Sequence, residues 1–223
     1  MNLPKTPKFQ AQRSIILNAA AQLFAEHGFH YASMVNLAKA SGLSKPLIYH
    51  YYKDKEEILF DIVDSYMSQL VDIVQQHQQS CQENNWSHQK SFEILVASFM
   101  TQYQHAQHQH MVLVQDVKFL RPDMRSIVVA KEKQVVGAFA QMVQKLYPGL
   151  QNSDLITPLT MSLFGMMNWT FTWLKPGGKL SHAQMGPLVS QLFLGGIESI
   201  ASELAVQESL QQNQNQSRSN SNV

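Results

Sequence analysis

The sequence predicts an all-α protein with a small N-terminal domain of three helices and a larger helical domain after it. Apolar residues recur at helical spacing along most of the chain, and the alternating pattern of a strand is nearly absent. Capping residues and helix-breaking Pro and Gly then mark where helices start and stop. These patterns favour domains at 1–54 and 55–207, followed by a polar tail at 208–223 whose composition predicts disorder.

The helices of the small domain are predicted from one apolar stripe and two caps. Gly28 ends the first helix as a C-cap glycine, after apolar residues at i, i+3, i+4, i+7 and i+8: Ile16, Ala19, Ala20, Leu23 and Phe24. Ser33 is expected to cap a second helix at about 34–40. Ser44 is expected to cap a third, whose first turn tolerates Pro46 because no intrahelical N–H is needed there.

The second and third helices have the spacing of a helix-turn-helix. Ala38, Gly42 and Ile48 stand at offsets 0, 4 and 10. Ala38 is small where the two helices cross, and Ile48 places the third helix in the core beside Leu37 and Leu43. Gly42 lies in the turn, where a left-handed backbone costs a residue with a side chain about 1 kcal/mol or more. The motif is predicted to read DNA with the outer face of the third helix.

The larger domain begins with a capping box. Asp54 and Glu57 open a long helix at about 55–80, which ends in a Gln-, Asn- and Ser-rich break near 79–88. Further helices are predicted at about 89–107, 123–146, 153–174 and 183–206, with boundaries at Pro122, Pro148-Gly149 and 175–178.

The last two predicted helices are apolar nearly all round, which predicts a homodimer. Such a helix must be buried on both sides, and a partner subunit supplies the second side. Gly195 and Gly196 each cost about 1 kcal/mol inside a helix relative to alanine. Close approach of another helix would offset that cost, and a simple bend near the helix end explains the pair as well.

Charge is concentrated at the N-terminus. Residues 1–55 contain seven Lys or Arg and two acids, whereas the whole chain has 17 bases, 16 acids and a formal net charge of +1. The rest of the chain therefore carries 10 bases and 14 acids. A basic segment on an acidic body is expected when only that segment meets phosphate.

The sequence indicates a cytoplasmic protein with no membrane partner. The one cysteine, Cys81, cannot form an internal disulfide and fits a reducing compartment. Prolines and lysines near the N-terminus replace the apolar run of a secretory signal. The longest apolar stretch, at about 161–174, is interrupted by Asn168 and is too short to span a bilayer.

Residues 16–29, 33–52 and 53–59 together resemble the DNA-binding segment of the TetR family of bacterial regulators. The three motifs follow in the order and spacing of the family and cover about a quarter of the chain. Ala32 stands where the family usually has threonine, and Asn36 where it often has an acid. The first departure is expected to remove one phosphate contact.

The resemblance implies which residues bind operator DNA. Lys45 would meet a phosphate or a guanine edge, and Tyr49 and His50 would donate to phosphate oxygens. Pro46 and Leu47 offer contacts for thymine methyl groups, and Tyr52 is expected in the core. The implied set is Ser33, Met34, Ser44, Lys45, Pro46, Leu47, Tyr49, His50, Tyr51 and Lys55.

A second resemblance concerns the effector. Residues 164–178, with Asn168 and Trp169, are similar to a segment of TetR-type repressors of fatty-acid, phenylacetate and steroid degradation, which respond to acyl-CoA thioesters. Residues 115–122 fit the same group. The resemblance implies a small-molecule effector and no other cofactor, and a ligand-binding set of Phe119, Arg121, Met166, Asn168, Trp169 and Trp173.

Other features of the larger domain have two interpretations each. Its methionines and tryptophans suit an adaptable cavity for an apolar guest, and they equally suit ordinary core packing. Lys118, Arg121 and Arg125 would match the phosphates of a CoA, or they form a solvated basic patch.

Enzymatic and metal chemistry have little support in the sequence. His105, His108 and His110 suggest zinc, but no further ligand at fixed spacing accompanies them, so a solvated helix end explains them better. Cys81 has no neighbouring base in the sequence. Because phosphate-loop and hydrolase motifs are also lacking, we do not expect an enzyme.

The sequence therefore predicts a ligand-responsive transcriptional regulator, namely a dimeric repressor that an acyl-CoA thioester releases from a palindromic operator. Ligand binding would move the helix at 55–80 and change the separation of the two recognition helices. One alternative is a repressor of an efflux pump that responds to a cationic or aromatic drug. Another is a helical bundle that binds protein and uses its basic segment only for solubility.

Overall fold

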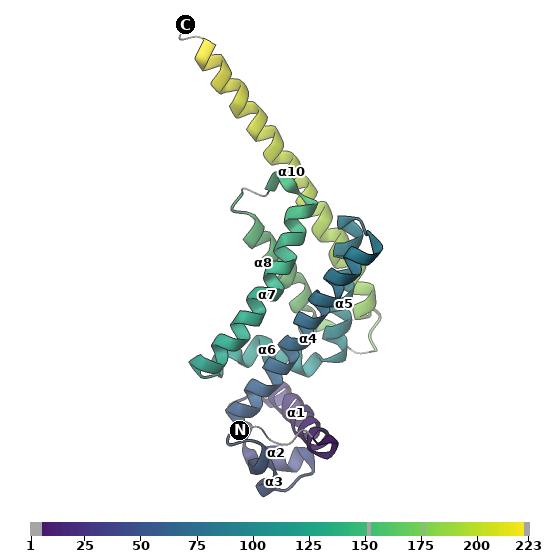
Figure 1. Cartoon of the computed structure of the whole chain (residues 1–223), viewed down its shortest axis with the longest axis vertical. Coiled ribbons are helices and arrows are strands. Elements are labelled where there is room, and N and C mark those ends of the chain that lie inside the picture. Colours follow the sequence, from purple (N-terminus) through teal and green to yellow (C-terminus); the bar gives the residue numbers. More distant parts are fainter. Residues whose placement is uncertain (1–5, 151–152, 176, 221–223) are drawn as a thin grey trace. The chain divides into compact units, whose positions relative to one another are not determined.

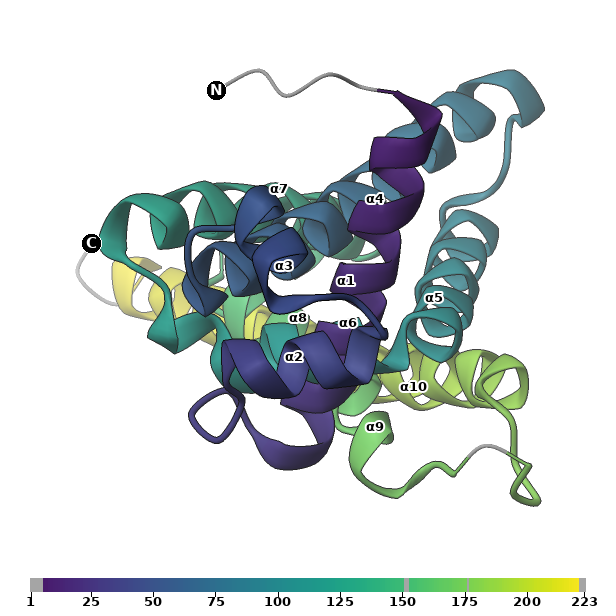
Figure 2. The same cartoon turned by 90° about the horizontal axis from the view of Figure 1, so that it is seen from below.

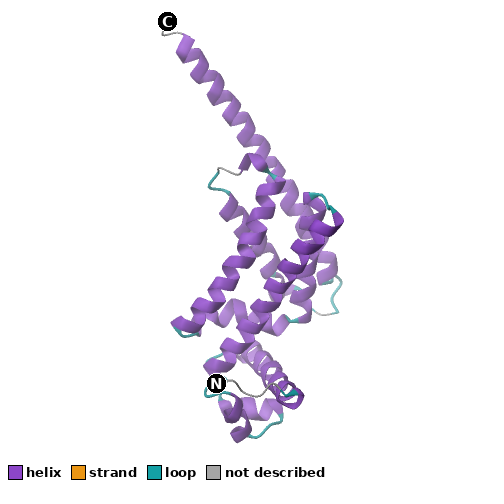
Figure 3. Ribbon diagram, viewed as in Figure 1, coloured by secondary structure: helices purple, strands orange, loops and turns teal. Residues whose placement is uncertain are grey.

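The computed structural model describes residues 6–150, 153–175 and 177–220, and this part of the chain consists of helices and loops without a strand (Figure 1, Figure 3). The predicted all-α fold is confirmed. The helices are α1 Pro7–His27, α2 Met34–Ser41, α3 Lys45–Tyr51, α4 Lys55–Asn84, α5 His88–His105, α6 Gln107–Asp116, α7 Pro122–Leu146, α8 Ile156–Asn168, α9 Thr170–Trp173 and α10 His182–Asn220, with 3-10 turns η1 Val117–Phe119 and η2 Pro148–Leu150.

Contacts divide the chain into two compact units, and the domain boundaries predicted from the sequence remain a prediction. The first unit combines Met1–Gln75 with Thr101–Val135, and the second combines Gln76–Met100 with Val136–Val223. The N-terminal helices thus share a unit with α6 and with parts of α4, α5 and α7. Helix α1 packs against both α2 and α6, which accounts for the place of α6 in this unit.

The first unit contains the helix-turn-helix formed by α2 and α3 (Figure 2). Its helix caps form as predicted. The Ser33 and Ser44 hydroxyl oxygens accept hydrogen bonds from backbone N–H groups three residues later, and the N–H of Gly28 donates to the Phe24 carbonyl at 2.8 Å. Gly42 adopts φ +67°, the left-handed conformation that the turn requires. The core side chains Ile16, Phe24, Leu37 and Ile48 are each at most 1% exposed.

Two reciprocal hydrogen bonds cap the N-terminus of α4. The backbone N–H of Glu57 donates to Asp54 Oδ1 at 2.8 Å, as the predicted capping box requires. The Glu57 carboxylate accepts from the backbone N–H of Lys53 at 2.7 Å, one residue before the capping position. These bonds fix where the chain leaves α3 and enters α4.

The second unit is built around stacked phenylalanines. Phe139 of α7 makes edge-to-face contacts with Phe99 of α5 and Phe164 of α8, each at 5.0 Å between ring centroids. Phe92 of α5 stacks on Phe193 of α10 at 5.4 Å. All five rings are buried. These contacts hold one face of α8 and of α10 in the core, so that the other face of each helix is left outside it.

Three segments differ from the expectation. Residues 107–116 form α6, which was not predicted because the segment is rich in glutamine and histidine. Its buried face consists of His110, Val112, Leu113 and Asp116. The helix predicted at 153–174 is interrupted at Trp169, between α8 and α9. Residues 208–220, predicted to be a disordered tail, continue α10; this segment contains neither proline nor glycine to stop a helix.

The apolar stretch at 161–174, predicted to be too short for a bilayer, is divided between the end of α8 and the short α9. Among the described residues, none of the helices combines the length and hydrophobicity that a membrane crossing requires.

Candidate nucleic-acid interface and effector residues

Helix α3 exposes a basic and aromatic face. Lys45, Pro46, Tyr49 and His50 are exposed on it, while Ile48 on the opposite side is fully buried. The Tyr49 ring is 48% exposed and lies 5.8 Å from the Lys45 ammonium, within range of a cation–π contact. A buried anchor behind exposed donors is the arrangement that a helix needs to enter the major groove.

The two capping serines lie at the same surface. Ser33 Oγ accepts from the Asn36 N–H at 3.1 Å, and Ser44 Oγ accepts from the Leu47 N–H at 3.3 Å. Both serines are exposed, and each hydroxyl keeps its own proton to donate. The geometry therefore agrees with phosphate contacts at the starts of α2 and α3, which remain predictions.

The other side chains predicted to bind DNA are partly withdrawn from the surface. Met34, Leu47 and Tyr51 are half-buried. The Tyr51 ring stacks on Phe9 at 4.5 Å, and its hydroxyl donates to Gln12 Oε1 at 2.7 Å, which ties α3 to α1. The predicted DNA contact of Tyr51 has no support from these bonds and stays a prediction.

Lys55 has a structural role that the sequence did not indicate. Its ammonium donates to three carbonyl oxygens of the α1–α2 loop, those of Phe29 at 2.8 Å, Ala32 at 3.0 Å and His30 at 3.2 Å. It also lies 4.5 Å from the centroid of the Phe29 ring. Burial lowers the pKa of Lys55. The predicted phosphate contact of Lys55 would therefore compete with bonds that it already makes.

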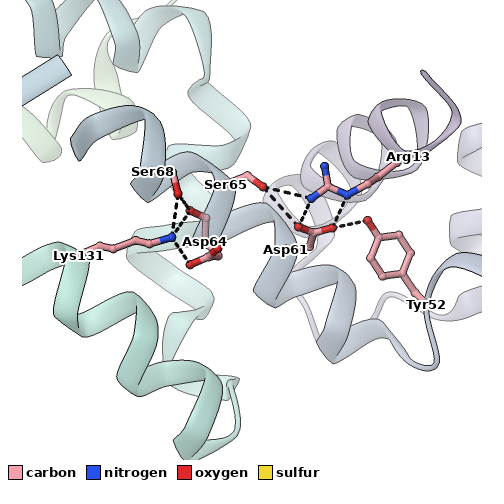
Figure 4. Close-up of polar contacts among 7 residues, drawn as sticks. All are labelled: Arg13, Tyr52, Asp61, Asp64, Ser65, Ser68 and Lys131. Carbon is pink, nitrogen blue, oxygen red and sulfur yellow. Dashed lines mark hydrogen bonds and ion pairs between the residues drawn. The ribbon is translucent and has the colours of Figure 1, made fainter. Parts of the chain in front are cut away.

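A partly buried ion pair joins α1 to α4, and Tyr52, which follows α3, bonds to the same carboxylate (Figure 4). The Arg13 guanidinium forms two hydrogen bonds with the Asp61 carboxylate, one of them from Nε to Oδ2 at 2.9 Å. The Tyr52 hydroxyl donates to Asp61 Oδ2 at 2.5 Å. Tyr52 is buried, as predicted, and burial together with the Asp61 charge raises its pKa far above the usual value. Asp61 thus holds both ends of the three-helix segment on α4.

A second polar cluster joins α7 to α4 within the first unit (Figure 4). Lys131 Nζ donates to Asp64 Oδ1 at 2.5 Å and to Ser68 Oγ at 2.8 Å. Residue spacing could not predict this pairing, because Lys131 lies more than 60 residues after Asp64 and Ser68.

Two residues predicted to bind the effector, Phe119 and Arg121, contact the α1–α2 loop and the start of α4, and their role in effector binding remains a prediction. The Phe119 ring stacks on Phe29 at 5.7 Å and meets the His30 ring edge-on at 4.2 Å. The Arg121 backbone N–H donates to Glu56 Oε1 at 2.5 Å, and its guanidinium lies 3.5 Å from carboxylate oxygens of Glu56 and Asp54. All of these residues belong to the first unit.

The other four effector residues belong to the second unit. Met166 and Asn168 are half-buried, whereas Trp169 is 66% and Trp173 50% exposed. In a single chain these two indoles face outward rather than lining an enclosed cavity. The six predicted residues are therefore divided between the two units.

The structure corrects the interpretation of Cys81. Its sulfur lies 3.2 Å from His77 Nε2 and 3.0 Å from Ser91 Oγ, so a base does lie beside the thiol. His77 is one helical turn before Cys81 on α4, and that i, i+4 spacing was visible in the sequence. His77 and Ser91 are buried and share a hydrogen bond of 2.9 Å.

The three clustered histidines lie in different surroundings. His110 is buried, with its Nδ1 3.2 Å from the Tyr66 hydroxyl and its ring stacked on Tyr103 at 3.9 Å. His105 is exposed and His108 half-buried. Over the described residues, no three His, Cys, Asp or Glu side chains are grouped as metal ligands.

Two buried histidines predict a loss of stability in mild acid. Burial lowers the pKa of His77 and of His182 below their ordinary value. Between the lowered value and about 6.5 the unfolded chain binds protons that the folded chain does not, so stability falls as pH falls through that window. We expect a lower Tm at pH 6.0 than at pH 7.5. At pH 6.0, about half a pH unit below the pKa of a free histidine, most histidines of the unfolded chain are protonated.

Thermal melts followed by circular dichroism test this pH dependence in the unchanged protein and two variants. The double variant His77→Gln/His182→Gln should lose much of the difference in Tm between the two pH values, while the exposed-site control His88→Gln should keep it. An equal difference in all three proteins would mean that other groups cause the acid sensitivity.

Known proteins match both parts of the chain. The family model "Bacterial regulatory proteins, tetR family" matches residues 16–62, and the model "Tetracyclin repressor-like, C-terminal domain" matches residues 87–197. The HTH-type transcriptional repressor KstR2 of Mycolicibacterium smegmatis is 26% identical over 201 residues, which cover 87% of this chain and 95% of the relative.

Two solved structures have the same fold. A TetR-family transcriptional regulator from Bordetella parapertussis 12822 superposes with a TM-score of 0.77 at 29% identity, covering 82% of this chain and 93% of the other. AibR, crystallised in complex with isovaleryl coenzyme A and operator DNA, superposes with a TM-score of 0.69 at 23% identity, covering 82% and 98%.

Proposed function

Because the chain belongs to the TetR family of bacterial regulators, whose members bind operator DNA and form dimers, we propose that it is a homodimeric repressor that an acyl-CoA thioester releases from a palindromic operator. The observation that carries the DNA-binding part is the exposed face of α3, where Lys45, Tyr49 and His50 lie opposite the buried Ile48. Two such helices in a symmetric dimer would read two half-sites about one helical turn apart.

Exposed apolar side chains on α8 and α10 support the dimer. Met161 on α8 is 53% exposed, and Leu188 and Leu192 form one stripe on α10 at i and i+4. Gly195 and Gly196 continue that stripe. A Cβ added at either glycine would have no atom of another part of this chain within 4 Å. A partner helix packed on this face would bury the leucines and approach the glycines closely.

If this face of α10 forms the dimer interface, a single charge introduced there should prevent dimerisation. Leu192→Glu would place a carboxylate in the apolar interface, so we expect the purified protein to become monomeric at micromolar concentration. Light scattering coupled to size-exclusion chromatography measures the mass directly. The control Ile127→Glu makes the same change at an exposed position of α7 and should leave a dimer. A Leu192→Glu protein that remains dimeric would show that α10 is not the interface.

The effector class is supported by the segment around Asn168 and by the complex of AibR with isovaleryl coenzyme A, a protein of the same fold. We propose that Met166, Asn168, Trp169 and Trp173 contribute to the acyl-CoA site. Their exposure in a single chain is compatible with a site that other surfaces complete.

Release from DNA would follow from a movement of α4. Its first turn carries Lys55, which holds the α1–α2 loop, and Glu56, which accepts from Arg121. We propose that effector binding shifts these bonds and so changes the position of α3. To lower operator occupancy from 99% to 1%, the effector must favour the non-binding state by roughly 5.5 kcal/mol.

Native mass spectrometry of the full-length protein tests the effector, with acyl-CoA thioesters, the matching free acids and cationic dyes as probes. We expect a dimer that gains a thioester. The same thioester should release an operator selected from a random DNA library. If the dimer binds dyes and no thioester, the acyl-CoA proposal is wrong and the protein is better explained as a drug-responsive repressor.

A further inference from the structure

A polar hollow lies in the first unit, where α1 and the end of α2 meet the junction of α5 and α6. Its volume is about 610 Å³, which is within the range of sites for drug-sized ligands. Ala106 separates α5 from α6 with a non-helical φ of −123° and ψ of 43°, and residues on both sides of it line the hollow. The small side chains of Ala19 and Ala40 also line it and leave the space open.

Amide side chains dominate the lining of this hollow. Five of them, each able to donate and to accept hydrogen bonds, come from three helices: Asn18, Gln22, Gln104, Gln107 and Gln109. His105 and His108 contribute imidazoles, and no Asp, Glu, Lys or Arg is among the described residues that line the hollow. A charged ligand would therefore find no carboxylate, ammonium or guanidinium partner in the lining, and a hydrocarbon chain would cover amide groups without bonding them.

The bonds that these amides already make leave them capacity for a ligand. Gln109 Nε2 donates to Asn18 Oδ1 at 3.4 Å, which is long and therefore weak for a hydrogen bond. Gln22 Nε2 donates to Glu26 Oε1 at 2.8 Å, which uses one of its two N–H groups. The five amide residues are exposed or half-buried, so water competes for each bond and a single ligand hydroxyl would gain little. A ligand that binds here must therefore offer many hydroxyl groups.

We propose that this hollow binds an uncharged sugar of two or more hexose units. The hydroxyl groups of the sugar donate to amide oxygens and accept from amide N–H groups on α1 and α6, those of Asn18 and Gln109 among them. A bound sugar thus connects α1, the first helix of the DNA-binding segment, to α6. Binding here is separate from the proposed acyl-CoA effector and does not depend on DNA.

Saturation-transfer difference NMR of the full-length protein with maltose tests this site. We expect binding with a Kd of roughly 1 mM, weakened at least about tenfold when two lining amides are replaced. Asn18→Leu/Gln109→Leu removes a bonded pair together, and Gln22→Leu/Gln104→Leu removes two other lining amides. The control Gln134→Leu/Gln141→Leu makes the same changes at exposed positions of α7 and should bind maltose as the unchanged protein does.

Thermal melts separate a lost contact from a lost fold. Each double variant should melt within about 2 °C of the unchanged protein, because the replaced amides lie at the surface, and a variant that does not fold leaves the decision to the other. Maltobionate, in which one unit of maltose is opened and carries a carboxylate, should bind no more tightly than maltose. Three results would overturn the proposal: no saturation transfer at about 10 mM maltose, ten times the expected Kd, equal affinity in the folded lining variants and the control, or tighter binding of maltobionate.

Discussion

Replacing Lys45 and Tyr49 together by alanine should lower operator affinity at least about a hundredfold. Both side chains are exposed on α3, and each good contact to a base or phosphate contributes about 1–3 kcal/mol. Loss of the two contacts in both subunits should therefore exceed the effect of any single substitution elsewhere on the surface. Fluorescence anisotropy with a labelled operator duplex measures the change.

The fold should not change in this variant. Tyr49 has an aromatic contact only with Lys45 among the described interactions, and Ile48 still anchors the helix. Circular dichroism should give the same helicity and Tm. The control Lys133→Ala removes a similar exposed charge from α7 and should bind the operator normally. Unchanged affinity in the double variant would remove the basis for assigning α3 to DNA, and would favour the protein-binding alternative.

Asp61→Ala should destabilise the N-terminal helices by about 2 kcal/mol. The substitution leaves the Arg13 guanidinium without its carboxylate and the buried Tyr52 hydroxyl without its acceptor. Breaking a fully buried pair costs about 3–5 kcal/mol, but Arg13 and Asp61 keep 30% and 21% of their side-chain surface in water, which lowers the cost. Urea unfolding measures the change.

A matched control lies on the same helix. Asp72 is exposed on α4, so Asp72→Ala should change the free energy of unfolding by less than about 0.5 kcal/mol. Asp61→Ala should also weaken operator binding, because Asp61 fixes the orientation of α1 and α3 on α4. If the two variants unfold at the same urea concentration, the three-helix segment is not held by this ion pair.

The local structure of the helix-turn-helix could be predicted because its determinants are close in sequence. Ser33 and Ser44 cap helices three residues ahead of the N–H groups that they bind, and Gly42 adopts the left-handed turn that its position requires. The core positions of Ile48 and Tyr52 follow from helical spacing. Each of these inferences needs a window of about a dozen residues.

Partners far apart in the chain could not be predicted in this way. Arg13 and Asp61 are 48 residues apart, and Arg121 and Glu56 are 65 apart. The contacts of Phe119 with the α1–α2 loop and of Arg121 with α4 are likewise contacts between residues far apart in the chain. The partner of each charged side chain depends on how the helices pack in three dimensions. Residue spacing along the chain does not encode that packing.

Helix α6 shows a different limit. Its polar composition hides a buried face, because His110 and Asp116 occupy positions where an apolar side chain would have revealed the helix. The neighbour of Cys81, in contrast, can be inferred from residue spacing alone. His77 stands four residues before it on the predicted helix at 55–80, which is the spacing that brings two side chains together.

Because Lys55 and Arg13 already bond to groups of their own chain, fewer basic side chains are left to displace counterions from bound operator DNA. Of the seven basic residues in 1–55, Lys55 is held by three carbonyl oxygens and Arg13 by a carboxylate, which leaves five for phosphates in each subunit. Each neutralised phosphate of duplex DNA contributes about −0.9 to the slope of log K against log salt concentration. For a dimer the slope should therefore be no steeper than about −9, and the two bases already engaged should remain silent in that titration.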